Sequence, residues 1–182
     1  ETCKELEKFF GFEVTYLGVD HKGRISLEEL EKSIRDDTIL VSIMYVNNEI
    51  GVINPIDEIK KIVKKYDKVK LHFDMVQALG KLPIDLNDVD LASFSAHKIY
   101  GLKGSGLLFK RRSTTIVPLI SGGQQEFSLR GGTSNACTNI VFAKTLRLAL
   151  DNFEQKNQHI KDINDYCRKC LQEIEGIVIN SD

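Results

Sequence analysis

A lysine, a histidine and two serines stand close together in the segment from Ser93 to Gly104. The run Ser95-Ala96-His97-Lys98 ends an apolar stretch and opens a loop that contains two glycines and a second lysine. An amine at such a place can form a Schiff base when desolvation or neighbouring positive charge lowers its pKa. Hydroxyl, imidazole and backbone N–H groups beside it can hold a phosphate. Lys98 is therefore a candidate reactive amine, although most lysines beside glycines are solvated loop residues.

The composition limits the classes of protein to which the chain can belong. The chain has 182 residues, a formal net charge of −1 and 42% hydrophobic residues, which suits one globular α/β unit and favours neither a nucleic-acid partner nor a membrane. Because the charged opening does not resemble a signal peptide, we expect a cytoplasmic protein, although an upstream targeting segment would leave no trace here. The cysteines are too few and too irregularly spaced for a disulfide framework. They are Cys3, Cys137, Cys167 and Cys170.

Hydrophobic periodicity predicts alternating helices and strands. Helices are predicted at residues 1–10, 26–35, 56–66 and, with a break near Asn157, 139–173. Strands are predicted at residues 12–17, 39–44, 69–73, 89–94 and 106–110, and a further strand is expected to begin at 177–179. Helices between strands indicate parallel pairing. The run 39–44 is apolar enough to be buried on both faces.

A polar cluster follows each of three predicted strands. These clusters are Asn47 to Gly51, His72 to Gln77, and the loop with Ser95, His97 and Lys98. The carboxyl ends of parallel strands share one edge of a sheet, where open α/β folds bind ligands. Asp74 at that edge would need a cationic partner, and the protonated ring nitrogen of pyridoxal 5'-phosphate (PLP) would serve. Gln77 could reach the phenolic oxygen of the same ring.

Four ordered segments carry a family resemblance. They are Val46-Asn47-Asn48-Glu49-Ile50-Gly51, His72-x-Asp74-x-x-Gln77-Ala78-x-Gly80-Lys81, Ser93-x-Ser95-x-His97-Lys98-Ile99-Tyr100-Gly101-x-Lys103-Gly104 and Gly122-Gly123-x-Gln125-Glu126-x-x-Leu129-Arg130-x-Gly132-Thr133. Over nearly its whole length the chain resembles cysteine desulfurases, which are PLP-dependent enzymes of the aminotransferase class V group. The resemblance implies an α/β fold, an incomplete large domain of a fold type I PLP-dependent transferase with a mostly parallel sheet flanked by helices.

The resemblance also implies a role for each matching residue. Lys98 would hold PLP covalently and act in catalysis, Asp74 would pair with the pyridine nitrogen, and Gln77 would bind the phenolic oxygen. Ser95 and His97 would bind the phosphate, with Asn48 near the phenolic oxygen. Thr133 would reach the phosphate of a neighbouring subunit, which implies a homodimer.

The implied activity is sulfur transfer. The enzyme would take sulfur from L-cysteine, leave L-alanine and an enzyme persulfide, and pass the sulfur to an iron–sulfur scaffold or a tRNA-thiolation protein. It would thereby serve iron–sulfur cluster or thio-cofactor biosynthesis.

Several positions depart from the family pattern. Met75 replaces a small residue, Leu102 a proline and Gln124 a glycine, and Gly131 stands where a serine is usual. Met75 is expected to point away from Asp74 as core filler. Gly131 loosens the backbone beside Thr133 and could weaken the contact between subunits.

The resemblance further implies which parts are not in this sequence. The family's ring-stacking histidine would precede Glu1, and its nucleophilic cysteine would follow Asp182. Residues 1–136 are then expected to be the central part of the PLP-binding large domain, and residues 137–182 the linking helices and the start of the small C-terminal domain. Such a fragment is expected to be inactive alone.

Two alternatives stay open. Another class V PLP enzyme, a selenocysteine lyase or an aminotransferase, would share Lys98 and Asp74, and a non-catalytic binding or dimerisation module would not need PLP. The spacing of Cys167 and Cys170 invites a zinc or redox site, but the pair falls inside a predicted helix without a second ligand pair, so no metal is expected. His72 is expected to be structural rather than a base.

Overall fold

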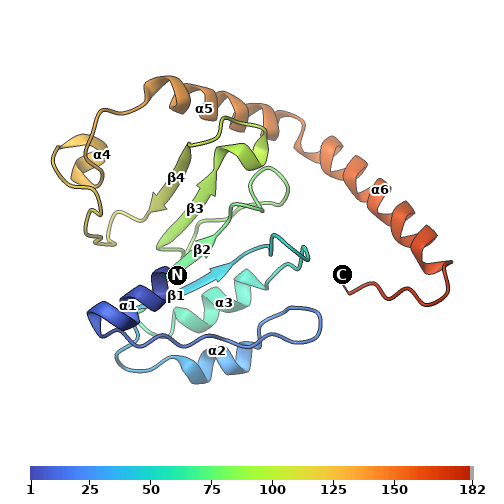
Figure 1. The fold of residues 1–182 in the computed structure, drawn as a ribbon, viewed down its shortest axis with the longest axis horizontal. Helices are drawn as coiled ribbons and strands as arrows, with labels where there is room; N and C mark the ends of the chain where they lie inside the picture. Colours follow the sequence, from blue (N-terminus) through green and yellow to red (C-terminus); the bar gives the residue numbers. More distant parts are fainter. Residues whose placement is uncertain (181–182) are drawn as a thin grey trace.

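A computed structural model describes residues 1–180, which contain a four-stranded sheet flanked by helices (Figure 1). The strand order follows the sequence: β1 (Leu40–Met44), β2 (Lys70–Asp74), β3 (Leu91–Ser95) and β4 (Gly106–Lys110). β1, β2 and β3 are parallel, and β4 is antiparallel to β3. The mostly parallel sheet confirms the predicted fold class.

The helices occupy the segments between and after the strands. Their bounds are α1 (Thr2–Phe10), α2 (Leu27–Ser33), α3 (Ile56–Val63), the 3-10 helix η1 (Ala96–Ile99), the short α4 (Gln125–Ser128), α5 (Ala136–Asp151) and α6 (Phe153–Gln172). The predicted N-cap of α2 is confirmed, because the Ser26 hydroxyl accepts a hydrogen bond of 3.2 Å from the backbone N–H of Glu29. No helix within residues 1–180 is both long and apolar enough to cross a bilayer.

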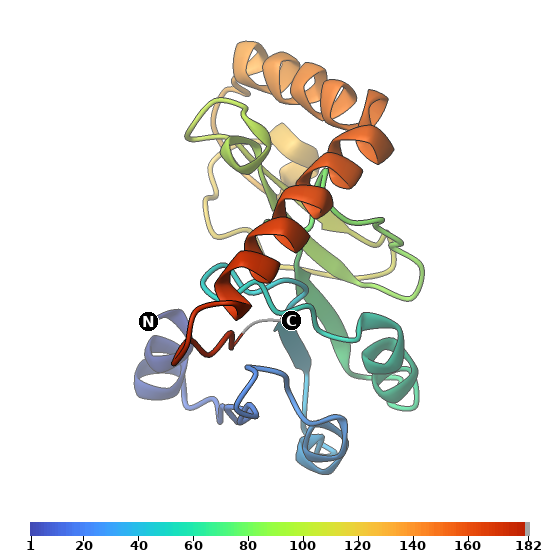
Figure 2. The same cartoon turned by 90° about the vertical axis from the view of Figure 1, so that its right-hand side faces the viewer.

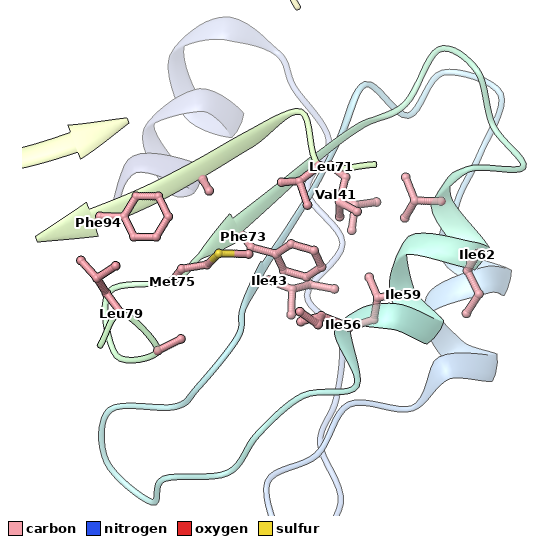
Figure 3. Packing of buried hydrophobic residues seen from close by; sticks show 14 of the residues in the cluster. Val41, Ile43, Ile56, Ile59, Ile62, Leu71, Phe73, Met75, Leu79 and Phe94 are labelled. Atoms are coloured by element: carbon pink, nitrogen blue, oxygen red, sulfur yellow. The ribbon is translucent and has the colours of Figure 1, made fainter. Parts of the chain in front are cut away.

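One face of the sheet packs against α3 and carries the core (Figure 3). Phe73 and Leu71 of β2 are almost completely buried, as is Ile59 of α3. Met75, one residue after β2, is also fully buried, which confirms that it is core filler. Because side chains alternate along a strand, the residues between these core positions must point to the other face.

That other face of the sheet is polar beside its carboxyl edge. The burial of β2 and β3 alternates, with His72 and Asp74 on β2 and Ser93 and Ser95 on β3 at the less buried positions. Ser42 stands opposite His72 in the register of β1 and β2. The apolar face therefore fixes the strands while the polar face offers hydrogen-bonding groups.

The last two helices differ in their packing. α5 contacts η1, and its Phe142 and Ala149 belong to the core. α6 has no buried residue, and it extends away from the sheet on the side where β1 to β3 end (Figures 1 and 2). An apolar groove of about 430 Å³ lies between α5 and the last two strands, lined by residues such as Leu82, Phe94, Phe109 and Leu146. The groove contains none of the predicted site residues.

Four predictions about strands are wrong for the described residues. Residues 12–17 form no strand, because they have no partner and Phe12 and Tyr16 are largely exposed; only an isolated bridge joins Val19 to Ile25. Residues 177–179 are likewise irregular. β4 is antiparallel because the short η1 loop, not a helical crossover, joins it to β3. β1 is buried on one face only, since Ser42 and Leu40 are exposed.

Helix ends also differ from the predictions. α2 ends at Ser33 rather than Arg35, and α3 ends at Val63 rather than near Tyr66. The break in the last third lies at Asn152 rather than Asn157, where the backbone leaves helical geometry (φ −121°, ψ 30°). The predicted division of the chain at residue 136 stays a prediction, and residues 181–182 of its second part lie outside the described residues.

Candidate active site

The predicted polar clusters converge at one edge of the sheet. In the register of the sheet, Met44 pairs with Asp74, and Asp74 pairs with Ser93. The segments that follow β1, β2 and β3 thus begin beside one another, and they carry Asn48, Gln77 and Lys98 in turn. This confirms the edge on which the sequence argument placed a site.

The loop after β3 presents Ser95, His97 and Lys98 together. The Ser95 hydroxyl lies 2.8 Å from His97 Nδ1, and the side chains of His97 and Lys98 are exposed. Tyr100 ends η1 in the left-handed conformation (φ 69°), which is strained for a residue with a side chain. A Cβ atom on Gly101 would lie 2.8 Å from the carbonyl oxygen of Ala96, so this tight return requires glycine.

Asp74 lies at the end of β2 and is half-buried. Its Oδ1 accepts a hydrogen bond of 3.0 Å from the backbone N–H of Val76. The ion pairs of Lys60, Lys64 and Lys70 go to other carboxylates, those of Asp85, Asp88 and Asp90. The Asp74 carboxylate can therefore accept a further hydrogen bond from a bound group.

His72 links three strands on the polar face. Its Nδ1 lies 2.7 Å from the hydroxyl of Ser42, and its Nε2 lies 2.9 Å from the hydroxyl of Ser93. Burial lowers the pKa of the His72 imidazole, and the Asp74 carboxylate opposes this in part. Both imidazole nitrogens thus lie within hydrogen-bond distance of serine hydroxyls on neighbouring strands, and the structural role of His72 stays a prediction.

Gln77 and Lys81 lie in the turn that follows β2. Lys81 Nζ donates a hydrogen bond of 3.2 Å to Gln77 Oε1. Partial desolvation, followed by repulsion from the Lys98 ammonium, lowers the pKa of Lys81. The turn and the η1 loop therefore bring the amines of Lys81 and Lys98 close enough for their charges to interact.

Asn48 and Thr133 are less closely tied to this cluster. Asn48 is exposed, and its Nδ2 donates a 3.1 Å hydrogen bond to Glu49 Oε1. Thr133 is exposed on the segment that joins α4 to α5. Figure 1 shows α4 on the opposite side of the sheet from the ends of β1 to β3.

Four residues near this edge were not predicted as parts of the site. Lys81 and Ser93 stand in the quoted motifs without an assigned role, and the spacing of four residues between Gln77 and Lys81 was a usable signal. Ser42 carried no signal, and the links from His72 to Ser42 and Ser93 depend on the register of the strands. Asn54 is buried with its Oδ1 lacking a hydrogen-bond partner, while its Nδ2 donates to the carbonyl of Met44.

The four cysteines lie on helices rather than in the loops that follow β1, β2 and β3. Cys3 is on α1, Cys137 on α5, and Cys167 and Cys170 on α6, and all four are free and exposed. Among the described residues, no three His, Cys, Asp or Glu side chains gather as metal ligands would. The groups at the sheet edge are an amine, a carboxylate, an imidazole and serine hydroxyls.

This donor set fits PLP. An exposed amine, a half-buried carboxylate at the end of a strand and the Ser95–His97 pair match the aldehyde, ring nitrogen and phosphate of that cofactor. The sequence pattern described as Aminotransferase class-V matches residues 1–182. The chain belongs to the aminotransferase class-V family. This family consists of PLP-dependent enzymes, in agreement with the predicted cofactor.

Relatives and solved structures show which class-V proteins this chain is similar to. Cysteine desulfurase IscS of Dictyoglomus turgidum is 44% identical over 183 aligned positions, which cover 99% of this chain and 46% of that protein. The mitochondrial cysteine desulfurase of Saccharomyces cerevisiae is 48% identical over 174 positions, covering 93% of this chain and 35% of that protein. A solved structure described as a NifS-like protein superposes with a TM-score of 0.92 at 40% identity, covering 98% of this chain and 49% of the other.

These matches confirm the predicted resemblance to cysteine desulfurases. The chain spans less than half the length of these relatives. The activity of the whole protein is therefore a matter for proposal.

Proposed function

We propose that the protein containing this chain is a PLP-dependent cysteine desulfurase, and that this chain supplies most of the cofactor site. The convergence of Asp74, Ser95, His97 and Lys98 at the carboxyl ends of β2 and β3 carries the proposal. It is supported by relatives that are named cysteine desulfurases at 44% and 48% identity.

Each side chain has a defined task in this proposal. PLP, when bound, supplies an aldehyde that condenses with an amine and a ring that withdraws electrons from the substrate. Lys98 Nζ holds the cofactor and moves protons to and from the substrate as a general acid and base. Asp74 keeps a proton on the ring nitrogen, because a carboxylate stabilises the adjacent positive charge.

The remaining residues orient the cofactor. Ser95 and His97 donate hydrogen bonds to the phosphate, Gln77 donates to the phenolic oxygen, and Asn48 contacts the cofactor on the same side. Thr133 contributes to the phosphate site of a second subunit in a homodimer. Its exposure on the segment between α4 and α5 is compatible with a contact between subunits.

The substrate and the sulfur acceptor follow from the same proposal. L-Cysteine gives up its sulfur to a cysteine thiolate, which becomes a persulfide, and L-alanine leaves. The four cysteines here lie on helices, so we assign the thiolate to a part of the protein outside this chain, which is then inactive alone. The persulfide passes sulfur to an iron–sulfur scaffold or a tRNA-thiolation protein, in the cytoplasm or, as the name of the yeast relative suggests, in mitochondria.

An absorbance measurement tests the cofactor site. The purified chain is incubated with PLP, and the visible spectrum is compared for the wild type, Lys98→Ala and Asp74→Asn. We expect a visible band in the wild type, no protein-bound band in Lys98→Ala, and a weaker or shifted band in Asp74→Asn. Equal spectra for the wild type and Lys98→Ala would overturn the assignment of Lys98.

A product assay on the longer protein separates the enzyme classes. A desulfurase releases alanine and an enzyme-bound persulfide from L-cysteine. A selenocysteine lyase prefers the selenium analogue, an aminotransferase needs a keto acid, and a binding module shows no PLP-dependent turnover.

A further inference from the structure

Lys81 fixes the orientation of the Gln77 carboxamide. Its ammonium lies 3.2 Å from Gln77 Oε1, and an ammonium can only donate hydrogen bonds. The atom that faces Lys81 must therefore be the amide oxygen, because two donors would repel each other. The amide nitrogen, with its two N–H donors, is then left for another acceptor.

The backbone holds this pair beside the reactive lysine. Gly80 has a positive φ of 69°, and a Cβ atom there would come within 3.2 Å of Ala149 on α5 and 3.3 Å of Ile99 on η1. The turn thus packs tightly against both helices, and Ile99 is the residue after Lys98. Partial desolvation and, to a smaller extent, the charge of Lys98 lower the pKa of Lys81. Gln77, Lys81 and Lys98 therefore belong to one local arrangement.

We propose that Lys81 is a positioning residue, which turns Gln77 so that its Nε2 donates to the phenolic oxygen of PLP. The inference rests on the proposed function, because the acceptor is part of that cofactor. Without Lys81 the amide can rotate by half a turn and present its oxygen to the phenolic oxygen, which is repulsive. Lys81 itself need not touch the cofactor.

A double-mutant cycle tests this role. PLP affinity and the pH titration of the visible band are measured for the wild type, Lys81→Met, Gln77→Ala and the double variant Lys81→Met/Gln77→Ala. We expect Lys81→Met to weaken PLP binding roughly two- to tenfold, the range for one ordinary hydrogen bond, and to shift the titration. In the Gln77→Ala background the same change should have no further effect. Lys81→Arg, which also can only donate, should restore binding.

Lys61→Met, at an exposed position on α3, is the matched control and should behave as the wild type. The inference is overturned if Lys81→Met equals the wild type in both measurements. It is also overturned if Lys81→Met has the same effect with and without Gln77, since Lys81 would then act by its charge alone. A wild-type chain that forms no adduct at Lys98 would instead refute the proposed function, and this inference with it.

Discussion

The segment from Leu40 to Gly101 and the segment from Ala136 to Gln172 differ in how their side chains are held. The first contains the three parallel strands and most of the core, and it carries every predicted site residue except Thr133. The second consists of α5, which docks through Phe142 and Ala149, and α6, which buries nothing. Most predicted site residues thus lie on or directly after strands whose opposite face is packed in the hydrophobic core.

The largest expected effect is in the core of the first segment. Phe73→Ala removes a fully buried ring beneath the site, and we expect it to lower the free energy of unfolding by about 3–5 kcal/mol. Ile163→Ala on α6, where the side chain is 55% exposed, should change it by no more than about 0.5 kcal/mol. Urea denaturation measures both, and similar losses would contradict the contrast between the segments.

The next effect concerns the return of the chain after η1. Gly101→Ala places a methyl group against the backbone of Ala96, and overpacking of this kind costs about 1–3 kcal/mol. The shift should also reduce the yield of PLP adduct at Lys98. Gly18→Ala, whose added Cβ atom would meet only the Glu29 carboxylate at an ordinary contact distance of 3.5 Å, should leave the adduct yield unchanged. Equal yields in the two variants would show that the η1 loop tolerates the side chain.

The two segments should also differ in how a histidine makes the free energy of unfolding depend on pH. His72 lies on β2 in the first segment, and His159 lies on α6 in the second. Because the pKa of His72 is lowered in the folded chain, the unfolded chain takes up a proton first as the pH falls below about 6.5. The contribution of His72 therefore makes the free energy of unfolding fall on acidification through that window. His72→Gln should show a smaller loss between pH 7 and pH 5, measured by urea denaturation at each pH.

Lys70 and Asp74 share the face of β2 with His72, and both remain in the variant. His159→Gln, at an exposed position on α6, is the control substitution. A His72→Gln chain with the same pH dependence as the wild type would contradict the assignment of a neutral, structural His72.

The smallest effect concerns the caps of the last two helices. The side chain of Asn135 caps α5 by accepting from Thr138 N at 3.2 Å, whereas Asn152 makes no side-chain cap at α6. Asn135→Ala should therefore cost about 1 kcal/mol, and Asn152→Ala less. Thermal denaturation ranks the two, and an equal or reversed order would contradict the description of α5 as the docked helix.

Local signals in the sequence were sufficient where one segment decides the structure. Ser26 with Glu29 predicted the start of α2, and the apolar runs placed β2, β3 and β4 to within two residues. The edge that carries the candidate site followed from the polar residues after β1, β2 and β3, because the carboxyl ends of parallel strands lie at the same edge of a sheet.

Signals that depend on distant partners were not readable in the same way. The alternation at residues 12–17 resembles a strand, but among residues 1–180 no neighbouring strand pairs with it. The direction of β4 depends on the short η1 connection, and the Ser42–His72–Ser93 link depends on register across three strands. The hydrogen bond from Lys81 to Gln77 depends on how the turn after β2 packs against η1 and α5.

Mapping the PLP adduct tests the central claim most directly. The chain is incubated with PLP, reduced with borohydride and digested, and the modified lysines are identified by mass spectrometry beside a Lys98→Ala control. The account predicts a dominant adduct at Lys98 that is lost in the control. Modification spread over exposed lysines such as Lys61 and Lys103, with no preference for Lys98, would contradict the claim that the ends of β2 and β3 assemble a cofactor site.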